Sequence, residues 1–84
     1  MKELTYMTHG TCSRAINVSV NDDGTIESVS FVGGCSGNTQ GVAALVRGMQ
    51  IDEAISRMEG IRCGFKSTSC PDQLAQALKQ IKEA

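Results

Sequence analysis

The sequence predicts an α+β fold in which a three-stranded antiparallel sheet is followed by three helices. Two β-rich segments, residues 14–21 and 26–32, flank the sequence Asn-Asp-Asp-Gly, which is typical of a hairpin turn. From residue 42 onward the apolar residues recur with the period of a helix instead. The change of period divides the chain into a sheet half and a helical half.

The strands are expected at Leu4–Thr8, at residues 14–21 and at Ile26–Val32. The middle strand alternates apolar and polar side chains, as a strand with one buried face does. Its apolar set is Ile16, Val18 and Val20. A hairpin turn at residues 21–24 would pair positions whose numbers sum to about 45 to 47.

Three helices are expected, each with one apolar stripe. The stripes are Val42, Leu45, Val46 and Met49 in the first helix, Ile51, Ala54, Ile55 and Met58 in the second, and Leu74, Leu78 and Ile81 in the third. Asn38 or Thr39 is expected to cap the first helix, and Gly60 is a natural residue to follow the second. The three stripes predict helices that cover one face of the sheet.

Length and composition indicate a single domain over residues 1–84 with little stability to spare. Eight Lys and Arg stand against nine Asp and Glu without a basic run, so we expect no nucleic-acid surface and no membrane-surface helix. No apolar run resembles a signal peptide or approaches the roughly 18 residues that span a bilayer. We therefore expect a cytoplasmic protein, whose cysteines act as metal ligands or redox groups rather than as structural disulfides.

The hairpin register is expected to bring two of the four cysteines together. Cys12 precedes the second strand, and the register places it opposite residues 33–35, so it should face Cys35. Paired strand positions lie about 4.5 to 5.5 Å apart between Cα atoms, which is close enough for two thiolates to share one metal ion. The spacing of the cysteines contains no C-x-x-C motif and is by itself a weak signal.

The other two cysteines are expected to complete the site. Ser69 or Cys70 should cap the third helix, where Pro71 suits the first helical position. Cys35 and Cys70 then both stand at helix N-termini, where the helix dipole favours a thiolate. Six residues separate Cys63 from Cys70, enough for the chain to double back and add a fourth ligand.

The glycine-rich turn around Cys35 permits a second kind of ligand. Gly33, Gly34, Gly37 and Asn38 could cradle a phosphate or other cofactor on backbone N–H groups, although neither nucleotide-binding glycine motif is complete. The same glycines could instead let the backbone curl around a metal ion. His9, close to Cys12, could replace one cysteine ligand, and an exposed histidine is the simpler interpretation.

The run Thr68-Ser69-Cys70-Pro71-Asp72 carries a family resemblance, since with Gly33-Gly34-Cys35 and Gly60-Ile61 it resembles the TSCPD domain family over nearly the whole chain. The resemblance implies that Cys12, Cys35, Cys63 and Cys70 are the four family cysteines. It also implies a link to deoxynucleotide synthesis, because the domain occurs at the C-terminus of adenosylcobalamin-dependent ribonucleotide reductases.

The chain also resembles, more distantly, the NifU-type (NifU/IscU) iron–sulfur assembly scaffolds, which share the order of strands, helices and ligand cysteines. Cys12, Cys35 and Cys70 fall at the matching places. Arg14 and Ser69 stand where those scaffolds have an aspartate and a histidine associated with a labile cluster. These departures, together with the additional cysteine, imply a more permanent site.

The expected function is a cysteine-liganded metal-binding module, with Zn²⁺ as the first choice and an iron–sulfur cluster as the alternative. It would be accessory to ribonucleoside-diphosphate reductase or to another redox protein. A thiol–disulfide relay through Cys63 and Cys70 and an iron–sulfur assembly scaffold stay open as alternatives. The chain is too short for a reductase barrel, so no catalytic residue is expected and any enzyme label would come from the family association.

Overall fold

A three-stranded antiparallel sheet followed by three helices forms the fold in the computed structural model, which describes residues 1–11, 13–34 and 36–83, with only the backbone of residue 36. The strands are β1 (Lys2–Met7), β2 (Ser13–Val20) and β3 (Ile26–Gly33), in the order β1-β2-β3. The helices are α1 (Ser36–Val46), α2 (Ile51–Met58) and α3 (Cys70–Glu83). The predicted α+β class is confirmed.

The β2–β3 hairpin has the predicted register. Ile16 pairs with Phe31 and Val18 with Val29, so paired numbers sum to 47, and Ser13 pairs with Gly33. At the turn, the Asn21 carbonyl accepts the Gly24 N–H at 3.0 Å. Gly24 has φ +87°, a conformation that glycine adopts without strain. This register fixes which residues meet at the far end of the hairpin.

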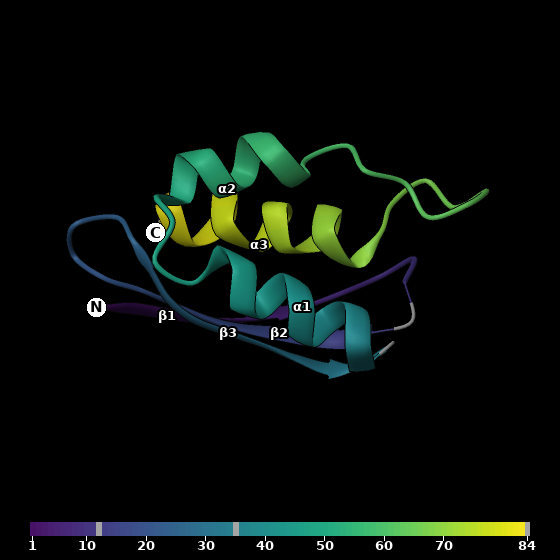
Figure 1. Ribbon diagram of the computed structural model, residues 1–84, viewed down its shortest axis with the longest axis horizontal. Helices are drawn as coiled ribbons and strands as arrows, with labels where there is room; N and C mark the ends of the chain where they lie inside the picture. Colours follow the sequence, from purple (N-terminus) through teal and green to yellow (C-terminus); the bar gives the residue numbers. More distant parts are fainter. Residues whose placement is uncertain (12, 35, 84) are drawn as a thin grey trace.

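The three helices lie on one side of the sheet (Figure 1). Helix α3 packs on β1 and β2, α1 packs on β3, and α2 packs on α3. Because α3 lies between the sheet and α2, it is buried on more than one side, with Leu74, Leu78 and Ile81 at most 1% exposed. Two ion pairs, Asp52–Lys82 and Glu59–Lys79, join the exposed sides of α2 and α3. The α3 stripe predicted from the sequence is therefore the centre of the core.

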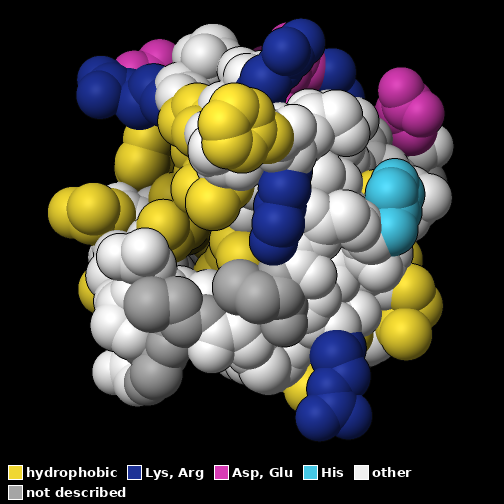
Figure 2. Space-filling model, turned by 90° about the vertical axis from the view of Figure 1, so that its right-hand side faces the viewer, with side chains coloured by type: hydrophobic (Ala, Val, Ile, Leu, Met, Phe, Trp, Pro, Cys, Tyr) yellow, Lys and Arg dark blue, Asp and Glu magenta, His cyan; other side chains and the backbone are white. Residues whose placement is uncertain are grey.

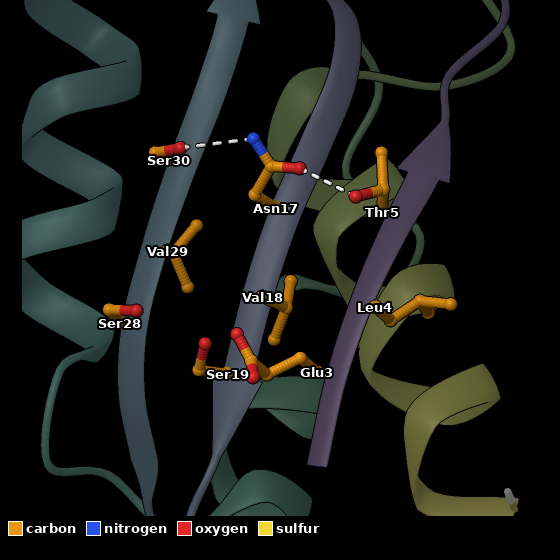
Figure 3. A pocket seen from close by; sticks show the side chains of 9 residues that line it. All are labelled: Glu3, Leu4, Thr5, Asn17, Val18, Ser19, Ser28, Val29 and Ser30. Atoms are coloured by element: carbon orange, nitrogen blue, oxygen red, sulfur yellow. Dashed lines mark hydrogen bonds between the residues drawn. The ribbon is translucent and has the colours of Figure 1, made fainter.

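Polar side chains of all three strands gather on the opposite face of the sheet, over which none of the described helices lies (Figure 3). Asn17 in β2 accepts a hydrogen bond from the Thr5 hydroxyl of β1 at 2.8 Å and donates one to Ser30 of β3 at 3.4 Å. These side chains line a shallow hollow across the three strands. The alternation predicted for the middle strand thus separates a buried apolar face from this polar one.

The first helix differs from its prediction. It begins at Ser36, before the expected caps Asn38 and Thr39, so those two residues lie inside the helix. Packing on β3 selects the buried side of α1: Thr39 and Val46 are 6% and 4% exposed, whereas Leu45, predicted in the apolar stripe, is 78% exposed. Met49 lies beyond the helix end at Val46. Periodicity located the helix but not the face that the sheet covers.

Leu78 in α3 and Leu45 in α1 give a direct test of the core. Leu78→Ala removes a fully buried side chain and should lower the free energy of unfolding by about 2 to 5 kcal/mol. Leu45→Ala, at a residue of the same type on the surface, should change it by less than about 0.5 kcal/mol. Urea denaturation followed by circular dichroism measures both. Equal losses in the two variants would contradict the packing of α1 described above.

Candidate metal-binding end of the fold

Helix α3 begins with a side-chain cap that fixes the position of Cys70. The Ser69 hydroxyl accepts the Asp72 N–H at 3.1 Å and donates to the Ile61 carbonyl at 2.7 Å. The Ser69 carbonyl accepts the Gln73 N–H at 2.8 Å, which closes the first turn. Of the two predicted caps, Ser69 is therefore the one in place, and Cys70 is the first residue of the helix, where the helix dipole favours a thiolate.

The Asp72 carboxylate holds the loop between α2 and α3 against that helix start. It accepts the Gly60 N–H at 2.8 Å and the hydroxyl proton of Thr68. Burial, with the residue 9% exposed, disfavours the charged form. Hydrogen bonds from Thr68, Gly60 and Gln76 outweigh it, so the pKa of Asp72 is held below its ordinary value of 3.8.

Gln73 extends this network to the β1–β2 loop. Its side-chain amide donates to the Thr68 hydroxyl oxygen at 3.1 Å, and its carbonyl oxygen accepts the His9 N–H at 3.3 Å. Gln73 is 3% exposed, and its hydrogen bond to Thr68 is buried, whereas the one from His9 is partly buried. His9 contributes its backbone here and has an exposed side chain. The network ties the loop that contains Cys12 to the start of α3.

Ser13 lies where β2, β3 and α3 meet. Its hydroxyl oxygen is 3.4 Å from the Cys70 sulfur, and its backbone pairs with Gly33. Gly34 has φ +86°, and a β-carbon added there would lie 3.2 Å from the Ser13 β-carbon. Ser13 is only 4% exposed. Since Ser13 follows Cys12 in sequence and Gly34 precedes Cys35, three cysteine-bearing segments converge on one point.

The structure describes two of the four predicted metal ligands, Cys63 and Cys70. Cys12 and Cys35, with their predicted pairing, lie outside the described residues. Cys70 is half-buried beside Ser13, and Cys63 is exposed. Within residues 1–11, 13–34 and 36–83, no three His, Cys, Asp or Glu side chains are grouped closely enough to hold a metal ion.

The loop that contains Cys63 doubles back on itself before α3. The Cys63 N–H donates to the Thr68 carbonyl at 3.1 Å, and the Cys63 carbonyl accepts the Lys66 N–H at 3.0 Å. These two hydrogen bonds close a tight turn, and Phe65 within it is fully exposed. Figure 1 shows this loop projecting from the end of the molecule opposite the N-terminus.

The predicted glycine cradle has a simple steric role at two of its positions. Gly33 and Gly34 have φ +79° and +86°, and Gly34 lets the chain pass close to Ser13. Gly37 and Asn38 lie in the first turn of α1 with exposed surfaces. Nothing in this geometry tests whether a phosphate binds, so the cofactor site stays a prediction.

Sequence reasoning assigned no structural role to Ser13, Thr68 or Gln73, although Thr68 begins the run that carries the family resemblance. A signal for part of the network was present, because a Ser followed three residues later by an acidic residue is a capping pattern. In the usual capping box the acidic side chain accepts the backbone N–H of the cap residue. Here the Asp72 carboxylate accepts hydrogen bonds from Gly60 and Thr68 instead. The Ser13 contact depends on how α3 packs on the sheet, which a single sequence does not reveal.

The Asp72 network predicts a pH-dependent stability. Because the folded pKa lies below 3.8, the carboxylate stabilises the fold fully above that pH, and the contribution is lost as pH falls through the folded value. At pH 7, Asp72→Asn should lower the free energy of unfolding by about 1.5 to 3 kcal/mol for each charged hydrogen bond that it weakens. Urea denaturation from pH 7 to pH 3 should show the two proteins converging at low pH.

The exposed Glu83 of α3 provides the control, since Glu83→Gln should change the free energy of unfolding by less than about 0.5 kcal/mol at any pH. A constant gap between wild type and Asp72→Asn down to pH 3 would contradict a stabilising role for the charge.

Two glycines of the turn test the close approach to Ser13. Gly34→Ala places a β-carbon in the left-handed region and against Ser13, and should cost about 1 to 3 kcal/mol. Gly37→Ala meets no atom within 4 Å and should leave stability unchanged or raise it by up to about 1 kcal/mol. Thermal denaturation of both variants decides the point, and equal melting temperatures would count against the convergence at Ser13.

Comparison with known proteins identifies the family of the chain. The model of the TSCPD domain matches residues 2–82, which is nearly the full length. No curated protein and no solved structure matches the chain. No helix in the described ranges is long and apolar enough to cross a membrane. On the extent of the domain match, the chain belongs to the TSCPD domain family.

Proposed function

We propose that this chain is a small cysteine-liganded metal-binding module, with Zn²⁺ as the bound metal and an iron–sulfur cluster as the alternative. Cys12, Cys35, Cys63 and Cys70 are its ligands. The module acts in the cytoplasm as an accessory to ribonucleoside-diphosphate reductase or to another redox protein. It is not catalytic by itself.

The contact between the Ser13 hydroxyl and the Cys70 sulfur, 3.4 Å apart, is the observation that carries this proposal. It supports a shared site because Ser13 is bonded to Cys12 in sequence and approached by Gly34, the neighbour of Cys35. A cysteine thiolate binds Zn²⁺ at about 2.3 Å, so ligands of one site must come from segments this close.

The chemistry of the donor set also fits a metal ion. Cys70 lies at the N-terminus of a 14-residue helix, which favours the thiolate that a metal requires. The hydrogen bond from the Cys63 N–H to the Thr68 carbonyl draws the loop back toward Cys70. Four thiolates suit tetrahedral zinc and an iron–sulfur cluster alike, so the donor set supports either group.

Folding energetics favour a metal in a chain of this size. A structural zinc site contributes an apparent 10 to 16 kcal/mol, on the order of the whole stability of a domain. The buried apolar side chains here are aliphatic and come from a chain of 84 residues. A metal ion would therefore supply much of the stability at the end of the fold where the loops meet.

The link to a reductase comes from the family. The family resemblance implies it, because the TSCPD domain occurs at the C-terminus of adenosylcobalamin-dependent ribonucleotide reductases, and this chain matches that domain over residues 2–82. We therefore propose that the module acts as an accessory of a partner enzyme.

Metal analysis of protein purified without oxygen tests the proposal. We expect about one zinc ion per chain, or iron with visible absorption if a cluster is bound, and unfolding when a chelator removes it. Cys70→Ser should lose the metal and melt at a much lower temperature. Ser67→Ala, an exposed change in the same loop, should retain both.

One result would overturn the metal site. If the double variant Cys63→Ser, Cys70→Ser melts like the wild type and neither protein contains metal, the thiols have another role. A colourless protein that takes up only zinc after anaerobic reconstitution would exclude the iron–sulfur alternatives, including an assembly scaffold.

A thiol–disulfide relay is the second candidate, because Cys63 is exposed while Cys70 lies at the start of a helix. The two thiols would lose two electrons and two protons to form one disulfide, and a reductase disulfide would accept them. Titration against a dithiol buffer without oxygen should then show a reversible two-electron couple. Thiols that stay protected by bound metal would exclude the relay.

A further inference from the structure

An open apolar groove lies between α1 and α2 and ends at the start of α3. Its volume is about 600 Å³. Apolar side chains dominate its lining: Val42, Leu45, Val46, Met49, Ala54, Met58, Ile61 and Pro71, with Glu53 and Arg57 at the side. None of the proposed metal ligands lines this groove, although Ile61 and Pro71 belong to the loop and the helix that carry Cys63 and Cys70.

Several large apolar side chains around the groove are exposed to water. Leu45 is 78% exposed, Ile61 is 44% exposed, and Phe65 in the neighbouring loop is fully exposed. Figure 2 shows hydrophobic side chains gathered on the end face of the molecule that carries this loop, with Lys or Arg side chains beside them. A cluster of this kind on a small chain is typical of a surface that another protein covers.

The charges around the groove are unbalanced. On α2, each acidic residue already has a cationic partner: Asp52 pairs with Lys82, and Glu53 pairs with Arg57 at 2.7 Å. Arg47 and Arg62 follow the lining residues Val46 and Ile61 in sequence and are exposed. Neither arginine has an ion-pair partner among the residues that the structure describes. Two exposed positive charges therefore stand next to groove-lining residues in sequence, without an ion-pair partner in the described ranges.

We propose that this groove binds an amphipathic helix of a partner protein that has an apolar stripe flanked by Asp and Glu. Helix α2, which lines one side of the groove, has eight residues and is about 12 Å long. A bound helix spans roughly 10.5 Å between positions i and i+7, so two turns of it can lie along α2. The apolar stripe would lie on Leu45, Met49 and Ile61, and the acidic flanks would meet Arg47 and Arg62.

The charge pattern selects this occupant over the others. A second copy of the chain docked through the same groove would bring Arg47 and Arg62 of both copies to one interface, and like charges would repel. A nucleic acid would find an apolar floor in place of a basic surface. The proposal is independent of metal binding, since no groove residue is a proposed ligand.

A synthetic helical peptide provides the test. The probe has about 18 residues, or about five turns, with leucine at i, i+3, i+4 and i+7 and glutamate on the other face, and it carries a fluorescent label. Titration of the intact protein should show binding that weakens as salt is added. The same peptide with lysine in place of glutamate should bind at least about tenfold more weakly.

Matched variants locate the binding site on the groove. Leu45→Ser and Arg62→Glu should each weaken peptide binding about tenfold. Val32→Ser, at an apolar residue on β3 that is 44% exposed, and Arg14→Glu, at an exposed arginine on β2, should leave it unchanged. Metal content measured on each variant separates loss of docking from any failure of the metal site.

Three results would overturn the proposal. Equal affinities for the glutamate peptide and the lysine peptide would show that charge does not select the partner. Absence of binding by either peptide would exclude a helix-binding groove. A wild-type dimer in sedimentation that becomes a monomer with Leu45→Ser would assign the groove to a second copy of this chain.

Discussion

The buried carboxylate of Asp72 is the interaction on which the cysteine-bearing end of the fold depends. It accepts hydrogen bonds from Thr68 and from the Gly60 backbone, and Gln73 continues the network to His9. Two loops far apart in the sequence are thereby fixed to the first turn of one helix. Without these hydrogen bonds, the loops would have only sparse apolar contacts to hold them, since the aliphatic core lies under the helices.

The network also gives the family signature a physical meaning. Thr68 and Asp72 bind each other, Ser69 caps the helix, and Cys70 meets Ser13 of the sheet. The signature therefore supports the position of a thiol at a helix N-terminus, where the thiolate form is favoured. The helical side of the molecule has a separate feature, the apolar groove, so that the proposed metal site and the proposed partner surface can coexist on one small domain.

Much of the fold could be predicted because local sequence specifies it. The alternation of β2 and the stripes of α2 and α3 each reflect a single apolar face, and the turn at residues 21–24 reflects its Asn-Asp-Asp-Gly sequence. The structure confirms all of them. Leu45 was wrongly placed in the core because several faces of α1 are apolar and packing on β3 selects one of them. For the site, the Ser69 cap was predictable from local pattern, whereas Ser13 and Gln73 act through tertiary contacts that no local pattern contains.

Titration of the Asp72 carboxyl carbon by NMR tests the central claim most directly. We predict a pKa below the ordinary 3.8, with the Gly60 and His9 amide protons shifting along the same curve and exchanging slowly with solvent. A pKa at or above 3.8, with those amides unaffected and exchanging freely, would contradict the account, because the carboxylate would then not hold the loops around Cys70.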